Sequence, residues 1–136
     1  MIEEFKNLSV DEVEVLLNTP VWVTLLIAGA DNKIDKREIE EAVSLTQLKQ
    51  NRARQPLTDY YKEVNKSFES NLKGYVSLLP KDKELRNQIL IENLEKLNNI
   101  LPRLEASFAI QFYQSIRDFA EKIANASGGI MGFLTL

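Results

Sequence analysis

The sequence contains no cysteine and no histidine among its 136 residues. The lack of cysteine excludes a disulfide framework, a thiolate zinc site and a cysteine nucleophile. The lack of histidine removes the most common general base and the most common ligand for transition metals. Zinc, copper and nickel are therefore poor candidates, and hard ions such as calcium or magnesium are the metal ions that the composition leaves open.

Motifs that carry known chemistry are also missing. The chain has no glycine-rich phosphate loop and no Gly-x-Ser-x-Gly turn. Without histidine or cysteine, an enzyme would have to use carboxylates or a metal. The closely spaced pairs Glu38/Glu41 and Glu92/Glu95 are more typical of a solvated helix surface than of an acid/base pair. We therefore predict a non-enzymatic protein without catalytic residues.

The chain has no excess of positive charge, because the net charge is −3 with 17 Lys and Arg against 20 Asp and Glu. A nucleic-acid-binding protein usually carries a basic footprint, so we predict no nucleic-acid partner. The one short basic run covers residues 49–54, Lys-Gln-Asn-Arg-Ala-Arg. We interpret it as a solvated helix end, since cations favour helix C-termini. A docking patch for an acidic partner is the alternative interpretation.

Long hydrophobic runs are absent too. The longest apolar stretch, residues 21–30, is far shorter than the ~20 residues that span a bilayer. The first five residues, Met-Ile-Glu-Glu-Phe, lack the basic and then apolar order of a signal peptide. These features predict no membrane span and a cytoplasmic location.

Helical periodicity is the pattern that the chain does show. Apolar positions recur at helical spacing along the sequence, and no alternation typical of strands competes with it. Hydrophobic residues make up 44% of the chain, a normal share for a globular protein. We predict a single all-α domain over residues 1–136, folded as a compact bundle of six or seven helices.

Two helices are expected at the N-terminal end. Ser9 and Glu12 form a capping-box pattern that opens a short helix ending near residue 17. Thr19 and Pro20 are typical of an N-cap and a first helical position, and predict that a second helix starts there. Residues 21–28 are apolar on all sides, which places this second helix at the centre of the core.

Proline, glycine and aspartate mark the later boundaries. A long helix is expected after Pro56, with Gly74 as the point where it would break and Pro80 as its end. Asp82 starts another helix, which Pro102 interrupts or kinks. The positions expected to face the core are Ile39, Ala42, Val43, Thr46, Leu57, Tyr60, Tyr61, Val64, Phe68, Leu72, Val76, Leu90, Leu94, Leu97, Leu101, Ala109, Phe112, Tyr113, Ile116, Phe119, Ala120 and Ile123.

The last helix is expected to end at the glycine cap Ser127-Gly128-Gly129. The remaining residues, 130–136, are mostly apolar. Two interpretations of this tail stay open: it packs onto the core, or it continues in a longer protein.

The segment from Asp31 to Glu38 is the most informative part of the sequence. It resembles the second half of an EF-hand loop, with Asp31, Asp35 and Glu38 at the fifth, ninth and last ligand positions. The first and third positions fall on Ile27 and Gly29, which have no side-chain oxygen. One interpretation is a divalent-cation site at the three carboxylates. The other is a capping box, in which Asp35 and Glu38 start a helix that runs to about residue 49.

A weak internal repeat accompanies this segment. Residues 27–34 resemble residues 123–130, and each segment follows an apolar helix. In the second copy the three candidate ligands are replaced by Ser127, Met131 and Leu134. A true repeat would imply two related helical halves, of which one keeps the acidic residues and the other serves packing.

An apolar helix followed by Ala-Asp-x-x-Ile and an acidic helix start resembles the tellurite-resistance TerB-like domains. Those domains carry Ala-Asp-Gly-x-Ile-x-x-x-Glu, often twice. The matching positions here are Ala30, Asp31, Ile34 and Glu38, with Asn32 in place of glycine, and in the second copy Ala126, Gly128 and Ile130. The resemblance implies a compact helical fold of pseudo-twofold character, with acidic turns that bind divalent cations.

Together these observations predict a non-enzymatic TerB-like module that binds a divalent cation, a protein partner or both, in bacterial stress response. The alternative is a purely structural helical protein that forms a homodimer or larger homo-oligomer without a ligand. In that case the apolar tail, residues 130–136, would supply the interface.

Overall fold

The computed structural model describes residues 2–29 and 34–126, and every regular element within those two ranges is a helix. The elements in chain order are η1 (Glu3–Phe5), α1 (Val10–Ala28), α2 (Lys36–Arg52), α3 (Leu57–Leu78), α4 (Lys83–Glu95), α5 (Leu97–Ile100), η3 (Leu101–Arg103) and α6 (Ala106–Ala126). The all-α class is thus confirmed. The predicted count of six or seven helices is not confirmed, because the described residues form five helices of 13 to 22 residues and some shorter helical turns. The predicted pseudo-repeat depends on residues 127–130, which lie outside the described ranges.

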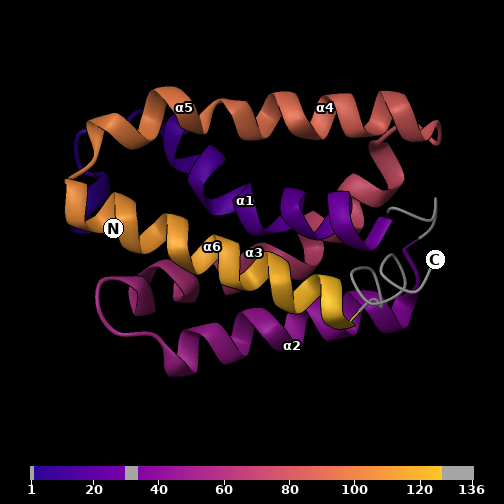
Figure 1. Ribbon diagram of the computed structural model, residues 1–136, viewed down its shortest axis with the longest axis horizontal. Helices are drawn as coiled ribbons and strands as arrows, with labels where there is room; N and C mark the ends of the chain where they lie inside the picture. Colours follow the sequence, from indigo (N-terminus) through magenta and orange to yellow (C-terminus); the bar gives the residue numbers. More distant parts are fainter. Residues whose placement is uncertain (1, 30–33, 127–136) are drawn as a thin grey trace.

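Helix α1 occupies the middle of the molecule, as the sequence predicts (Figure 1). It packs against α3, α4 and α6, whereas α2 packs against α3 and α6. Figure 1 shows α4 and α5 along one side of the molecule and α2 along the opposite side, with α1 and α6 between them. In the described part of the chain, no helix combines the length and the apolar character needed to cross a membrane.

The prediction of two separate N-terminal helices is wrong, because α1 runs without interruption from Val10 to Ala28. Its start is as expected: the Ser9 side chain accepts from the Glu12 backbone at 3.1 Å, and the Glu12 side chain accepts from the Ser9 backbone at 2.9 Å. Thr19, the expected second N-cap, lies inside the helix and donates its hydroxyl proton to the carbonyl of Val15 at 2.8 Å. Pro20 is therefore an internal residue of one long helix.

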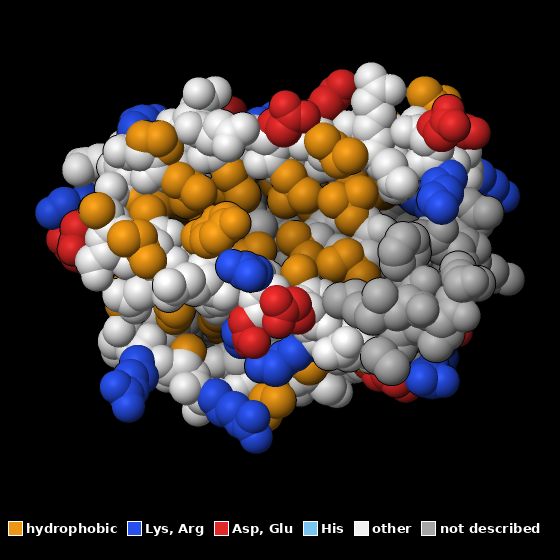
Figure 2. All heavy atoms as spheres, in the orientation of Figure 1, with side chains coloured by type: hydrophobic (Ala, Val, Ile, Leu, Met, Phe, Trp, Pro, Cys, Tyr) orange, Lys and Arg blue, Asp and Glu red, His pale blue; other side chains and the backbone are white. Residues whose placement is uncertain are grey.

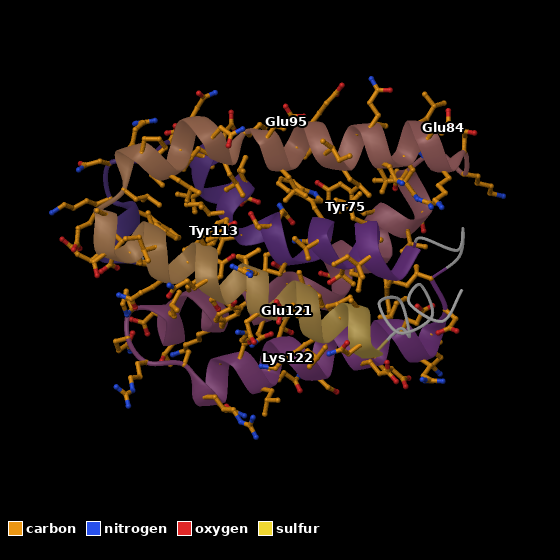
Figure 3. All side chains as sticks on the ribbon, viewed as in Figure 1. Tyr75, Glu84, Glu95, Tyr113, Glu121 and Lys122 are labelled. Atoms are coloured by element: carbon orange, nitrogen blue, oxygen red, sulfur yellow. The ribbon has the colours of Figure 1, made fainter. Side chains whose placement is uncertain are left out.

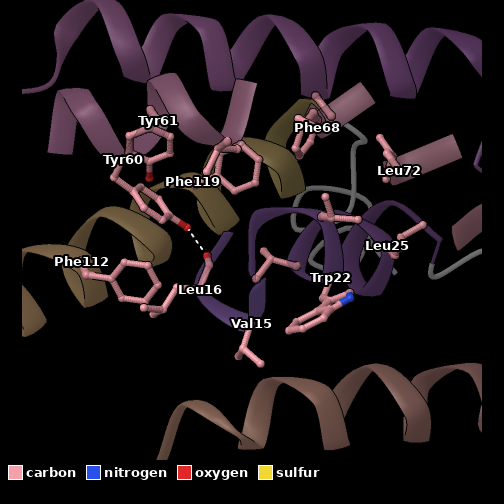
Figure 4. Close-up of a cluster of buried hydrophobic side chains, with 14 of the residues drawn as sticks. Val15, Leu16, Trp22, Leu25, Tyr60, Tyr61, Phe68, Leu72, Phe112 and Phe119 are labelled. Carbon is pink, nitrogen blue, oxygen red and sulfur yellow. Dashed lines mark hydrogen bonds between the residues drawn. The ribbon is translucent and has the colours of Figure 1, made fainter. Parts of the chain in front are cut away.

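A hydrogen bond from α3 explains how the helix tolerates this proline. Pro20 has no backbone N–H, so the carbonyl of Leu16, one turn earlier, loses its usual donor inside the helix. The hydroxyl of Tyr60 donates to this Leu16 oxygen at 2.6 Å, and both side chains are fully buried (Figure 4). Burial raises the pKa of Tyr60 well above its usual range, so the phenol keeps its proton.

Aromatic rings surround this hydrogen bond. The Tyr60 ring meets the rings of Tyr61 and Phe112 edge to face, with centroids 5.0 and 5.3 Å apart. Phe5, from the turn before α1, meets Phe108 in the same way at 5.6 Å. Such edge-to-face pairs contribute roughly 0.5–1.5 kcal/mol beyond the burial of their surface. The N-terminal turn, α3 and α6 are thereby held in one aromatic cluster.

Most residues predicted to face the core do so, with two clear exceptions. Val76 is 41% exposed and Tyr113 is 61% exposed. Each lies at the flank of its apolar stripe, where a helical pattern cannot show whether a neighbouring element covers it. Phe108, which the stripe of the last helix did not include, is 1% exposed and belongs to the core.

The expected break at Gly74 does not occur, since α3 is one helix from Leu57 to Leu78. A Cβ built on Gly74 meets no atom within 4 Å. We predict that Gly74→Ala raises the free energy of unfolding by about 0.5–1 kcal/mol, because alanine restricts the unfolded chain and favours a helix interior. Urea denaturation measures this change.

The matched control is Gly29→Ala, at the C-cap of α1. We expect a smaller gain there, because the residue is outside the helix interior. A loss of stability in Gly74→Ala would contradict the open space that the structure shows beside α3.

Candidate functional site

The carboxylates of the predicted ion segment form a capping box at the start of α2. The Asp35 side chain accepts a hydrogen bond from the Glu38 backbone at 2.8 Å, and the Glu38 side chain accepts one from the Asp35 backbone at 3.1 Å. This confirms the capping interpretation for both residues. Asp31, the third predicted ligand, lies outside the described residues. Among the described residues, no group of three or more acidic side chains could hold a metal ion. Cation binding at this turn stays a prediction.

A pocket of about 380 Å³ opens between α2 and α6. The side chains that line it are Leu45, Leu48, Lys49, Arg52, Ala53, Leu57, Gln111, Gln114, Ser115, Asp118 and Lys122. Apolar residues of α2 and α3 thus lie beside three cations and one carboxylate, which leaves an excess of two positive charges around the pocket. Such a combination suits a ligand that carries both acidic and apolar groups.

Asp118 holds the charged part of this pocket together. Its Oδ2 accepts from Lys49 Nζ at 2.5 Å and from Lys122 Nζ at 2.7 Å. The hydrogen bonds from Lys122 and Lys49 hold the pKa of Asp118 below its ordinary value, so the carboxylate is ionised at neutral pH. The side chain of Lys49 is only 15% exposed. This corrects the expectation of a fully solvated basic run, because Lys49 at its start is bound to α6.

A second tyrosine of α3 supports the floor of the pocket. The hydroxyl groups of Tyr61 and Ser115 form a buried hydrogen bond of 2.6 Å. Burial raises the pKa of Tyr61 to about 12, which keeps the phenol neutral at physiological pH. Tyr60 and Tyr61 therefore join α3 to two different neighbours, α1 through Leu16 and α6 through Ser115.

The pocket continues along the junction of the two helices. A second hollow of about 360 Å³ shares Leu45 and Leu48 with the first, and extends to Arg37 at the start of α2 and to Ala126 at the end of α6. Glu40 and Glu41 also line this second hollow, so its excess charge is negative. We call the two hollows together the α2–α6 groove. Figure 3 shows Lys122 of α6 at this junction, and Figure 2 shows acidic and basic side chains gathered where α6 faces α2.

The face of the molecule shown in Figure 2 also carries an apolar band. Figure 2 shows hydrophobic side chains gathered between α4–α5 and α6. Tyr113, 61% exposed, lies on the side of α6 that faces this band (Figure 3). Exposed apolar patches often mark contact surfaces.

Local sequence patterns contain only part of the signal for the groove. Asp118 and Lys122 are four residues apart on one helix, a spacing that favours an ion pair. Lys49 is 69 residues from Asp118 along the chain, so no local pattern can predict their contact. The basic run at residues 49–54 includes Lys49 and Arg52, but the sequence does not show that Lys49 binds α6.

The fold and these pockets define a class: an all-helical domain with a charged and partly apolar groove between two helices. No family model matches the sequence, and no solved structure matches it. The chain is 31% identical over 130 residues to Uncharacterized protein ORF11' of Methanothermobacter thermautotrophicus. The match covers 92% of this chain and 80% of the archaeal protein. The chain therefore belongs to the family of this archaeal protein.

Replacing Asp118 tests the charged centre of the groove. We predict that Asp118→Asn lowers the free energy of unfolding at neutral pH by about 1 kcal/mol, since the carboxylate is 44% exposed and solvent screens part of its effect. The folded pKa is depressed, so this stabilisation is present above the ordinary value of 3.8 and is lost as the pH falls through and below it. Urea titrations at successive pH values should show that the difference in the free energy of unfolding between wild type and variant shrinks over that range.

Glu121→Gln is the control, because Glu121 makes an exposed 3.9 Å ion pair with Arg117 on the same helix. We expect little change in stability from it at any pH. The assigned role of the Asp118 charge would be contradicted if the difference in the free energy of unfolding between wild type and Asp118→Asn stayed the same at acidic pH.

Proposed function

We propose that the protein is a non-enzymatic, TerB-like helical binding module, and that its α2–α6 groove binds an acidic segment of a protein partner. The observation that carries this proposal is the excess of two positive charges around the first hollow, beside the apolar side chains Leu45 and Leu48. An amphipathic segment that lies along a groove between two helices is a common form of peptide recognition.

The charged groups of the groove have different roles in this proposal. Asp118 is ionised and shared by two ammonium groups, so it positions the lysines and is not available as a general base. Arg52 is exposed and forms no ion pair with any residue that the structure describes. A carboxylate of the partner can therefore bind the Arg52 guanidinium through two parallel hydrogen bonds.

Size supports a segment rather than a single side chain. The two hollows of about 380 and 360 Å³ adjoin through Leu45 and Leu48. An acidic group of the partner would lie at the Arg52 end of the groove, and apolar groups of the partner would contact Leu45 and Leu48. The resemblance to TerB-like domains would connect such binding to metal-related stress processes in the cytoplasm.

A peptide selection tests the proposal. Immobilised protein is presented with a library of random helical peptides, and the bound peptides are sequenced. We expect enrichment of peptides that combine Asp or Glu with large apolar residues, and a loss of affinity of about tenfold or more in Arg52→Glu, because charge reversal replaces attraction by repulsion.

Lys62→Glu is the matched control, since it makes the same charge change at an exposed position of α3 that does not line the groove. Selected peptides should bind this variant almost as well as the wild type. Peptides without acidic residues, or equal loss of binding in both variants, would refute the groove as the site.

A second candidate function is divalent-cation binding at Asp31, Asp35 and Glu38. It rests on the resemblance of residues 31–38 to half of an EF-hand loop, and the structure holds the Asp35 and Glu38 side chains at the same end of α2. Carboxylate oxygens held near one another are the ligands that calcium prefers. In this interpretation the ion would stabilise the turn between α1 and α2 and link the fold to the ion concentration.

Thermal unfolding with and without millimolar calcium or magnesium, after chelator treatment, tests this second function. A cation at 100 times its dissociation constant would add ~2.7 kcal/mol of stability, which raises the melting temperature measurably. Asp35→Ser should abolish the shift, because serine keeps an N-cap but removes the carboxylate.

Asp82→Ser is the control, since Asp82 caps α4 in the same way by accepting from the Leu85 backbone at 3.0 Å. It should leave the ion response intact. No ion-dependent shift in the wild type would leave Asp35 and Glu38 with their capping role alone.

A further inference from the structure

A separate pocket of about 500 Å³ lies where the C-terminal end of α1 meets the turn between α3 and α4. Its apolar walls are formed by Leu25, Ile34, Val76, Leu79 and Pro80. Val76, which the sequence predicted to be buried in the core, borders this pocket and is 41% exposed. The volume lies within the range of about 300–1,000 Å³ that is usual for small-molecule sites.

The polar part of this pocket is a buried arginine. Arg86 of α4 lines the pocket and is 9% exposed, which makes it the most deeply buried cation of the described chain. Its Nη2 donates to the carbonyl oxygen of Gly29 at 2.7 Å. Its Nε is buried and has no hydrogen-bond partner among the described residues. No carboxylate in the described ranges forms an ion pair with it.

The position of the guanidinium group is fixed by α1. A Cβ on Gly29 would lie 3.9 Å from Nη2 and 4.0 Å from both Cζ and Nε of Arg86. These distances are ordinary van der Waals contacts, so the guanidinium group lies against the end of α1 and an alanine at Gly29 would still fit. The bond to the Gly29 carbonyl accounts for one donor, as is usual for a cation at a helix C-terminus.

That single bond leaves the buried charge under-compensated. A buried charge is costly unless an opposite charge and further hydrogen bonds accompany it. A guanidinium group forms its strongest contacts with carboxylates, through two parallel hydrogen bonds. A second cation, Lys81, lines the same pocket, is exposed and forms no ion pair with a described residue. Both cations therefore favour an anionic group in this pocket.

We propose that this pocket binds a small aliphatic carboxylate, whose carboxylate group contacts Arg86 and Lys81 and whose hydrocarbon chain packs against the apolar walls. This site is distinct from the α2–α6 groove, and its ligand class differs from the acidic protein segment proposed there. An aliphatic chain matches the walls because all five wall residues are apolar and none is aromatic. The charged group matches Nε of Arg86, a buried donor without a partner among the described residues.

Titration calorimetry with octanoate tests this proposal, with octanol and acetate as comparison compounds. Octanol has the same chain without the charge, and acetate has the charge without the chain. We expect octanoate to bind the wild type more tightly than either compound. Arg86→Met should raise the octanoate dissociation constant by about tenfold or more, because it removes the charged hydrogen bonds and keeps an apolar stem.

Two further variants keep the test decisive if Arg86→Met does not fold. Val76→Trp alters a half-exposed wall residue and should obstruct the pocket, so octanoate binding is expected to weaken while Arg86 is untouched. Lys83→Gln removes a charge at an exposed position of α4 outside the pocket and should leave octanoate binding unchanged. Arg52→Glu, in the α2–α6 groove, should also leave it unchanged, so the two sites are tested independently.

Amide shifts in a nitrogen–proton correlation spectrum locate the bound octanoate. We expect the shifts to be largest for Gly29 and for residues 79–86. The proposal is overturned if the wild type does not bind octanoate at millimolar concentration, if octanol binds equally well, or if Arg86→Met and Val76→Trp both fold and bind octanoate as the wild type does.

Discussion

The hydrogen bond from the Tyr60 hydroxyl to the Leu16 carbonyl is the interaction on which the rest of the structure depends. Pro20 removes the donor that this carbonyl would have inside α1, and the phenol of α3 replaces it. A buried carbonyl without a partner costs about 1–3 kcal/mol, so the pairing lets α1 continue as one helix through its buried middle. Because α3, α4 and α6 all pack on α1, a helix interrupted at Pro20 would change the positions of all three.

Both candidate sites follow from this arrangement. Tyr61, next to the tyrosine that binds α1, joins α3 to Ser115 of α6 and so supports the floor of the α2–α6 groove. The intact α1 ends at Gly29, whose carbonyl accepts a hydrogen bond from the guanidinium group of Arg86. One site thus lies where two helices leave a charged groove, and the other lies where a helix end meets a buried cation. In both, the main chain and a few buried polar side chains position the charged groups.

Local signals in the sequence predicted the local features well. The N-caps Ser9, Asp35 and Asp82 are where their patterns place them, because a cap depends on residues within one turn. The break at Pro20 was predicted wrongly, since the donor that rescues the helix is 44 residues away from Leu16. The Lys49–Asp118 pair and the Arg86–Gly29 contact escaped prediction for the same reason, because each joins segments that only the tertiary fold brings together. Local sequence patterns therefore predict where helices start, whereas the contacts that form the two candidate sites depend on the tertiary packing.

A double-mutant cycle on Tyr60 and Pro20 tests this central constraint most directly. In the wild-type background, Tyr60→Phe should lower the free energy of unfolding by about 1–3 kcal/mol, because it leaves the Leu16 carbonyl unpaired. In the Pro20→Ala background the alanine N–H can donate to that carbonyl, so the same change should cost clearly less. Urea denaturation of the four proteins gives the coupling energy. An equal loss in both backgrounds would contradict the account, since it would show that the tyrosine does not substitute for the donor that Pro20 lacks.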